Sequence, residues 1–174
     1  MVHLSHHLAC RKLLPSVGAI ATVFLALIVY PSAAAQTKEG NDAELRNVMN
    51  MYAEAVNKAD AQLASQVWCG SEEDSLTNPA GHWQGPQQIK ALYALLSESY
   101  SERKLTFDTI SIHSYGDFAW TEFTGDFVAK QRKDGTPFSF HAAETQIYRK
   151  SHGKWCLVHV QYSTFPAQQT GERE

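Results

Sequence analysis

Acidic side chains that could accept or donate a proton alternate along one segment of the chain. Trp120, Glu122, Thr124 and Asp126 are spaced two residues apart, which places them on one face of a β-strand. If this face lines a pocket, burial raises the pKa of the carboxyls, and Glu122 or Asp126 becomes a candidate catalytic base. If the face meets solvent or a second subunit instead, the two carboxylates are ordinary surface groups.

Histidines form the second group of side chains suited to chemistry. No two histidines after residue 35 have the i,i+4 spacing on a helix, or the His-x-His spacing on a strand, that metal sites often use. We therefore expect neither a metal nor a cofactor. His159 is a third candidate base, because it shares strand parity with Trp155 and Leu157, which we expect to face helices, and with Gln161. The alternative is a buried, hydrogen-bonded histidine.

Two cysteines, Cys69 and Cys156, follow residue 35. Ser139 and Ser163 lack the motif of an activated nucleophile, and Cys156 is better explained as a strand residue or as half of a disulfide. An even number of cysteines in an exported chain indicates a single Cys69–Cys156 disulfide. Two buried thiols are the alternative.

Residues 1–35 have the pattern of a signal peptide. Arg11 and Lys12 precede an apolar run over residues 17–30, and alanines at positions 33–35 suit signal peptidase. We predict cleavage before Gln36 and a secreted or periplasmic protein; the alternative is an uncleaved membrane anchor. Residues 36–41 are expected to form a short polar lead-in.

Removing residues 1–35 from the 174 leaves 139 residues, which is enough for one domain with a sizeable core. Arg11 and Lys12 are lost with the leader, so 13 basic and 18 acidic side chains remain, a formal charge of −5. No basic stripe or polybasic segment remains for nucleic acid or anionic lipid. We expect neither nucleic acid nor, after cleavage, a membrane as a partner.

The hydrophobic pattern divides the rest of the chain into helices followed by strands. Apolar residues between Leu45 and Ala59 recur every three or four positions, which predicts a helix, with Asn41 and Glu44 as a capping pair. A short helix begins after Asp60, and a third begins at Gly85 with a proline in its first turn. After about Glu102 the period becomes two, and three glycine-containing turns separate four strands.

Helices followed by an antiparallel meander are typical of an α+β fold. The three helices must cover one face of the sheet, so the sheet should curl around them into a cone whose open end is a pocket. "GPQQIKALY" (residues 85–93) and the meander resemble the nuclear-transport-factor-two-like superfamily, which includes SnoaL-like proteins and ketosteroid isomerases. The resemblance implies a cystatin-like cone over residues 42–166, with three N-terminal helices packed on a strongly curved antiparallel sheet. Residues 167–174 would form a flexible tail.

A narrower resemblance is carried by "EAVNKAD" (residues 54–60) and "ETQIYRKSHGKWCLVH" (residues 144–159). Both are similar to the association domain of calcium/calmodulin-dependent protein kinase II. The chain has no kinase motif and no basic amphipathic segment before Asn41 for calmodulin, so neither kinase activity nor calmodulin binding is expected. The cavity arginines of that family have no evident counterpart, and its ligand properties are not carried over.

Ketosteroid isomerase chemistry requires a carboxylate base beside a hydroxyl that stabilises an enolate. The resemblance places Tyr52 at the position of the oxyanion tyrosine and Glu144 near the second acid. The position of the base, however, holds Asn78, whose amide cannot accept a proton. This argues against isomerase activity, and Tyr52 could equally be a core residue of its helix.

Aromatic and polar residues expected near the open end of the cone form the predicted pocket: Tyr52, His82, Trp83, Trp120, Glu144, Trp155, His159 and Gln161. The leading hypothesis is an exported homodimer or higher oligomer that binds a small, partly apolar ligand in the cone. One alternative is an assembly module without a ligand, acting through the outer face of the sheet. The other is an isomerase, dehydratase or cyclase that uses His159 or Glu122 as its base.

Overall fold

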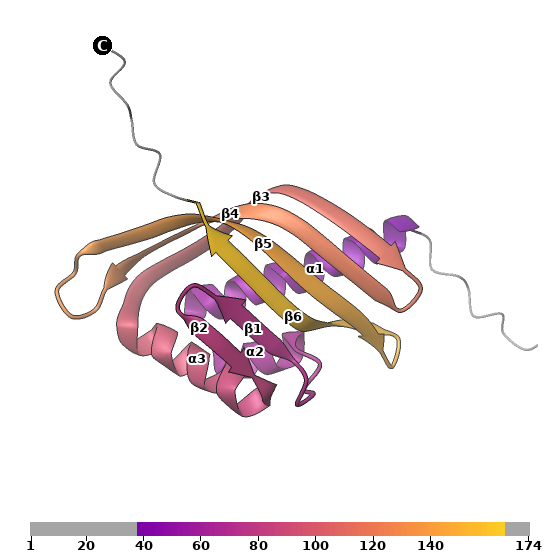
Figure 1. Cartoon of the computed structure of the whole chain (residues 1–174), viewed down its shortest axis with the longest axis horizontal. Coiled ribbons are helices and arrows are strands. Elements are labelled where there is room, and N and C mark those ends of the chain that lie inside the picture. The colour runs from indigo at the N-terminus through magenta and orange to yellow at the C-terminus, as the bar shows by residue number, and fades with distance from the viewer. Residues whose placement is uncertain (1–37, 166–174) are drawn as a thin grey trace, which may run out of the picture. The chain divides into compact units, whose positions relative to one another are not determined.

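The computed structural model describes residues 38–165 (Figure 1). The predicted signal peptide and the predicted C-terminal tail lie outside the described residues. The described chain forms, in order, α1 (Lys38–Lys58), α2 (Ala61–Val67), β1 (Ser75–Asn78), β2 (Gly81–Gln84), α3 (Gly85–Ser99), β3 (Tyr100–Tyr115), β4 (Phe118–Gln131), β5 (Pro137–Ser151) and β6 (Lys154–Thr164). No helix among these residues is long and apolar enough to span a bilayer.

The strands form one six-stranded sheet in the order β2-β1-β6-β5-β4-β3. Three helices pack on this curled sheet (Figure 1), which confirms the α+β cone predicted from the sequence. The sheet is mixed rather than wholly antiparallel, because β1 runs parallel to β6. The β1–β2 hairpin was not predicted: four-residue strands are too short for a period of two to be recognised. The hairpin turns at Asn78, whose Oδ1 accepts hydrogen bonds from the backbone of Ala80 and Gly81.

Helix α1 begins at Lys38, so part of the predicted polar lead-in is helical. The predicted capping pair is wrong because Asn41 lies inside the first turn and is engaged elsewhere. Its Oδ1 accepts a hydrogen bond from Lys150 Nζ on β5 at 3.1 Å, and Glu44 lies 3.9 Å from the same ammonium. Both side chains therefore connect the start of the helix to the sheet.

The starts of the other two helices follow the predicted chemistry. Asp60 caps α2, and its Oδ1 accepts hydrogen bonds from the backbone of Gln62 and Leu63 at 2.8 and 3.0 Å. Helix α3 begins at Gly85, which has a φ of +77° and donates its N–H to the Asp74 carbonyl at 2.8 Å. Pro86 follows in the first turn, where its missing N–H is not needed.

The core lies between the helices and the inner face of the sheet. On β4 the burial alternates, so Thr121, Phe123 and Phe127 point inward while Glu122 and Asp126 point outward. Fully buried side chains from both layers fill the space: Leu45 and Met49 on α1, Tyr93 on α3, Tyr148 on β5 and Leu157 on β6.

Strand β6 contains one extra residue, and this residue reverses which side chains face the core. Ile147 pairs with His159 and Tyr148 pairs with Leu157, which leaves Val158 unpaired in a bulge. Leu157 and Val160 are therefore both fully buried, although they are three residues apart. As a consequence His159 and Gln161 belong to the outer face of the sheet, not to the inner face predicted from strict alternation.

A disulfide between Cys69 and Cys156 joins the segment after α2 to β6, with the two Cα atoms 5.0 Å apart. Backbone contacts flank it: Cys69 N–H donates to the Leu157 carbonyl at 3.0 Å, and Trp68 forms a parallel bridge with Leu157. The bond therefore ties the C-terminal end of α2 to β6.

Candidate functional site

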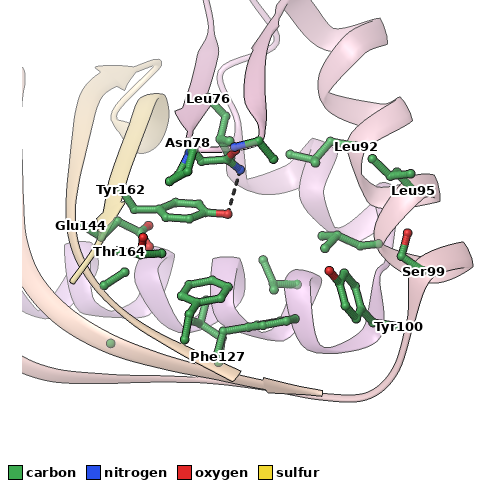
Figure 2. Close-up of a pocket in the computed structure, with 18 of the residues that line it drawn as sticks. Leu76, Asn78, Leu92, Leu95, Ser99, Tyr100, Phe127, Glu144, Tyr162 and Thr164 are labelled. Atoms are coloured by element: carbon green, nitrogen blue, oxygen red, sulfur yellow. Dashed lines mark hydrogen bonds between the residues drawn. The ribbon is translucent and has the colours of Figure 1, made fainter. Parts of the chain in front are cut away.

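The cone encloses a cavity of about 340 Å³ between the helices and the inner face of the sheet. Figure 2 shows side chains from helices and strands pointing into it. Leu76, Leu92, Leu95 and Leu96, from β1 and α3, form an aliphatic wall. Leu95 is half exposed, which places it where the cavity meets solvent.

Five aromatic rings on four strands form a second wall: Tyr100, Phe127, Phe138, Phe140 and Tyr162. They contact one another in series, with ring centroids 4.9 Å apart for Tyr100 and Phe138, 5.3 Å for Phe127 and Phe140, and 5.6 Å for Phe140 and Tyr162. Because each ring is held by its neighbours, we expect the wall to be rigid and largely formed before any ligand binds.

A group of polar side chains lies around Glu144, whereas Ser99 and Tyr100 line the cavity on the side away from it (Figure 2). Glu144 on β5 pairs across the ladder with Tyr162 on β6, and Figure 2 shows the two side chains next to each other. Asn78 Nδ2 donates a hydrogen bond to the Tyr162 hydroxyl at 2.7 Å. Tyr52 on α1 and Thr164 also line this cavity. The β1–β2 hairpin thus contributes directly to the polar part of the site.

The Glu144 side chain is oriented by a chain of buried polar groups. Gln146 Nε2 donates a hydrogen bond to Glu144 Oε1 at 2.7 Å, and Gln146 Oε1 accepts one from the Tyr148 hydroxyl. All three residues are buried. The donors in this chain point toward the carboxyl, so they hold one Glu144 oxygen in place while the residue lines the cavity.

Burial raises the pKa of Glu144 to about 8, and the hydrogen bond from Gln146 opposes part of that rise. Without a ligand, the carboxyl is therefore mostly protonated at pH 7. A carboxyl that titrates near neutral pH can donate a hydrogen bond, act as an anion for a cationic partner, or transfer a proton.

Four tyrosines around Glu144 stay uncharged over the same pH range. Burial raises the pKa of Tyr162 to about 12, and it also raises the pKa of Tyr52, Tyr93 and Tyr148. The proximity of the Glu144 carboxylate adds to each of these shifts. Their hydroxyls therefore serve as neutral donors and acceptors.

Of the eight residues predicted to form the pocket, Tyr52, Trp83 and Glu144 line the cavity. Trp120 does not, because it lies on the outer face of β4 and stacks on His113 with centroids 4.8 Å apart. Trp155 is a core residue, buried beneath the Lys150 ammonium, which lies 4.8 Å from its ring centroid. His82 is exposed, and its Nδ1 lies 2.8 Å from Thr77 Oγ1.

The three candidate bases all lie outside the cavity. Glu122 and Asp126 are exposed on the outer face of β4, where Asp126 Oδ1 lies 2.8 Å from His141 Nδ1. His159 Nδ1 lies 2.9 Å from Ser75 Oγ, and partial burial, followed by the nearby His82, lowers the pKa of its imidazole. Gln161 is exposed. The bulge at Val158 is the reason that His159 and Gln161 miss the cavity.

The aromatic wall of the cavity and the buried polar chain that orients Glu144 were not singled out in the sequence, although one signal was present. Phe138, Phe140, Glu144, Gln146 and Tyr148 alternate along β5 on the inner face. Extending this period from Glu144 in both directions would have identified both the aromatic wall and the buried polar chain. The described residues contain no group of three or more His, Cys, Asp or Glu side chains able to hold a metal ion.

A family model for the SnoaL-like domain matches residues 45–168, and the chain belongs to this family. An NTF2-like superfamily protein from Salmonella enterica serovar Typhimurium LT2 is 31% identical, with a TM-score of 0.72 over 79% of this chain and 100% of that one.

More distant structures share the fold alone. A cystatin-like protein from Nostoc punctiforme is 17% identical, with a TM-score of 0.61 over 75% of this chain and 95% of that one. The hexachlorocyclohexane dehydrochlorinase LinA-type3 from Novosphingobium barchaimii is 11% identical, with a TM-score of 0.65 over 74% and 88%. No curated protein matches the chain. The narrower resemblance to the kinase association domain stays a prediction.

Proposed function

We propose that this SnoaL-like domain binds a small, partly apolar molecule inside its cone. The observation that carries the proposal is the cavity of about 340 Å³, whose walls are aromatic and aliphatic and in which Glu144, Tyr162 and Asn78 form one polar group. Small-molecule sites are typically concave and apolar, with few well-placed polar groups that fix the orientation of the ligand. The apolar body of the ligand would lie along the aromatic wall, with its polar end at Glu144 and Tyr162.

Blocking the cavity should abolish binding without disturbing the outside of the sheet. Ala142 is buried and lines the cavity, whereas the next residue, Ala143, is exposed on the opposite face of β5. We expect Ala142→Phe to weaken binding of the neutral apolar probe N-phenyl-1-naphthylamine at least tenfold, about 1.4 kcal/mol. Ala143→Phe is the matched control and should bind the probe as the wild type does. Titration by probe fluorescence measures both; equal affinity in all three proteins would contradict a site in the cone.

We also propose that the protein is exported and that it forms a homo-oligomer. The Cys69–Cys156 disulfide supports an oxidising compartment, such as the periplasm or the cell exterior, because such bonds are rare in reducing cytosol. The leader that would direct export falls within residues 1–35, outside the described residues.

An exposed aromatic cluster on the outer face of the sheet supports a homo-oligomer. Tyr115 and Phe118 are 65% and 47% exposed, and Trp120 stacks with Tyr115 at a centroid distance of 5.5 Å. The same face carries Asp126 and Arg149, so a second copy could meet both acidic and basic groups. Clustered exposed rings of this kind commonly mark contact surfaces, and a second copy of the chain is the partner we propose.

Native mass spectrometry of protein purified from an exporting host tests both parts. We expect a dimer or larger closed oligomer, with each subunit beginning at Gln36. Phe118→Arg should produce monomers, because a buried arginine without a partner is costly, whereas Leu95→Arg on α3 should leave the oligomer intact. A monomeric wild type would contradict the proposed homo-oligomer. A subunit that retains residues 1–35 would contradict the proposed export and cleavage.

A further inference from the structure

We infer that the ligand of the cone carries a cationic amine, which binds the Glu144 carboxylate and the adjoining aromatic rings. This inference rests on the proposed binding function and specifies the chemical class of the ligand. It follows from the distribution of charge in the cavity, from the direction of the hydrogen bonds at Glu144 and from the composition of the wall.

The lining of the cavity provides no counter-charge for an anionic ligand. Among the described residues that line it, Glu144 is the one carboxyl, and none is lysine, arginine or histidine. Glu144 is only 7% exposed. An anion beside it would be buried without a counter-charge, and above pH 8 it would also meet the Glu144 carboxylate; both are strongly unfavourable. A cation, in contrast, would give the carboxylate the partner that the lining residues do not provide.

The hydrogen bonds around Glu144 favour its charged form. Gln146 Nε2 donates a hydrogen bond to Glu144 Oε1 at 2.7 Å. The Gln146 amide is held in that orientation because its oxygen accepts a hydrogen bond from the Tyr148 hydroxyl. A donor held against a carboxyl oxygen stabilises the carboxylate over the acid. These hydrogen bonds therefore support a carboxylate at this place in the cavity, and an ammonium group supplies the opposite charge.

The aromatic wall offers the second half of a cation site. Tyr162 lies opposite Glu144 in the strand ladder, and its ring continues into Phe140 and Phe127. Cations bind to the faces of aromatic rings, and desolvated sites strengthen this attraction; quaternary ammonium groups are often held in such aromatic surroundings. Figure 2 shows Glu144, Tyr162 and Phe127 around the same space.

The affinity of the cavity for a cation should depend on pH. Glu144 has a pKa of about 8 in the empty cavity, so below pH 8 it must release a proton when a cation binds. The titratable groups that face it are Tyr52 on α1, Tyr93 on α3, Tyr148 on β5 and Tyr162 on β6, all of which stay neutral. Affinity for a permanent cation should therefore rise about tenfold between pH 6 and pH 7 and level off above pH 8.

Two probes of equal shape separate charge from hydrophobicity: benzyltrimethylammonium and its uncharged carbon isostere, neopentylbenzene. Both are titrated against the wild type at pH 8.5 by displacement of N-phenyl-1-naphthylamine. We expect the cation to bind at least tenfold more tightly than the isostere. Glu144→Gln should remove this difference and keep the affinity for the isostere. The control Glu122→Gln, on the outer face of β4, should behave as the wild type.

The outcomes distinguish this inference from the proposed function. If both probes bind the wild type equally, the cationic ligand is excluded and the binding function stands. If neither probe nor N-phenyl-1-naphthylamine binds, both fail. If Glu144→Gln does not fold, the wild type alone decides: affinity for the cation must rise about tenfold from pH 6 to pH 7 while that for the isostere stays constant, and a flat profile for the cation overturns the inference.

Discussion

Glu144→Gln is expected to stabilise the unliganded protein at pH 8.5 by about 3–5 kcal/mol relative to its effect at pH 5. The carboxyl has an ordinary pKa of 4.5 in the unfolded chain and about 8 in the folded protein. Between these values the unfolded chain has released the proton and the folded protein still holds it. Wild-type stability therefore falls as the pH rises from 4.5 to 8, and the loss is complete above pH 8.

Glutamine removes this loss because its side chain is neutral at every pH. It also keeps the local hydrogen bond, since the new amide oxygen can accept from Gln146 Nε2 as Glu144 Oε1 does. Urea unfolding of both proteins at pH 5 and pH 8.5 gives the double difference, in which the titration of all other groups cancels.

Glu122→Gln is the matched control for this effect. Glu122 is exposed on the outer face of β4, so the variant should show the pH dependence of the wild type. If Glu144→Gln also shows that dependence, then burial does not hold the Glu144 carboxyl in its protonated form, and the description of the polar side chains around Glu144 is wrong.

The helices and long strands could be predicted because their signals are local and repeated. Leu45, Val48, Met49 and Tyr52 recur on one side of α1, and the structure buries all four. Likewise, the two-residue period of β4 extends over the whole strand. Since three amphipathic helices and a long sheet can bury their apolar faces only against each other, the cone followed from the pattern.

The candidate bases could not be placed correctly, because each depended on information that no local pattern contains. For Glu122 and Asp126 the face of the strand was known but not which face is inside; Phe123 and Phe127 on the other face settle that question in the structure. For His159 a single extra residue, Val158, reverses the alternation. A bulge has no distinctive residue type, so strict parity from Trp155 misplaces the side chains that follow Val158.

Asn78 shows a different limit. Its amide argued against a base at this position, but no pattern in the sequence indicated that it would donate a hydrogen bond to the Tyr162 hydroxyl, 84 residues away. That contact depends on the parallel pairing of β1 with β6, which joins distant segments. Glu144, in contrast, was identified as a pocket residue, because the resemblance to the family carried its position and not only its type.

The double substitution Cys69→Ser/Cys156→Ser is expected to lower the free energy of unfolding by about 3–5 kcal/mol. The disulfide closes a loop between residues 87 positions apart, so the unfolded chain gains much conformational freedom when the bond is lost. The fold should persist, because the hydrogen bond from Cys69 N–H to the Leu157 carbonyl does not involve either sulfur.

Urea unfolding with and without reductant separates the bond from the substitutions. Reductant should bring the wild type to the stability of the double variant and leave the double variant unchanged. A wild type that is insensitive to reductant would mean that the bond does not form in solution. Because neither cysteine lines the cavity, affinity for N-phenyl-1-naphthylamine should remain at the wild-type value in the folded double variant. A loss of stability without a loss of affinity would place the effect of the disulfide in the unfolded chain, whereas a parallel loss of affinity would show that the bond also holds β6 and its tyrosine in the geometry of the site.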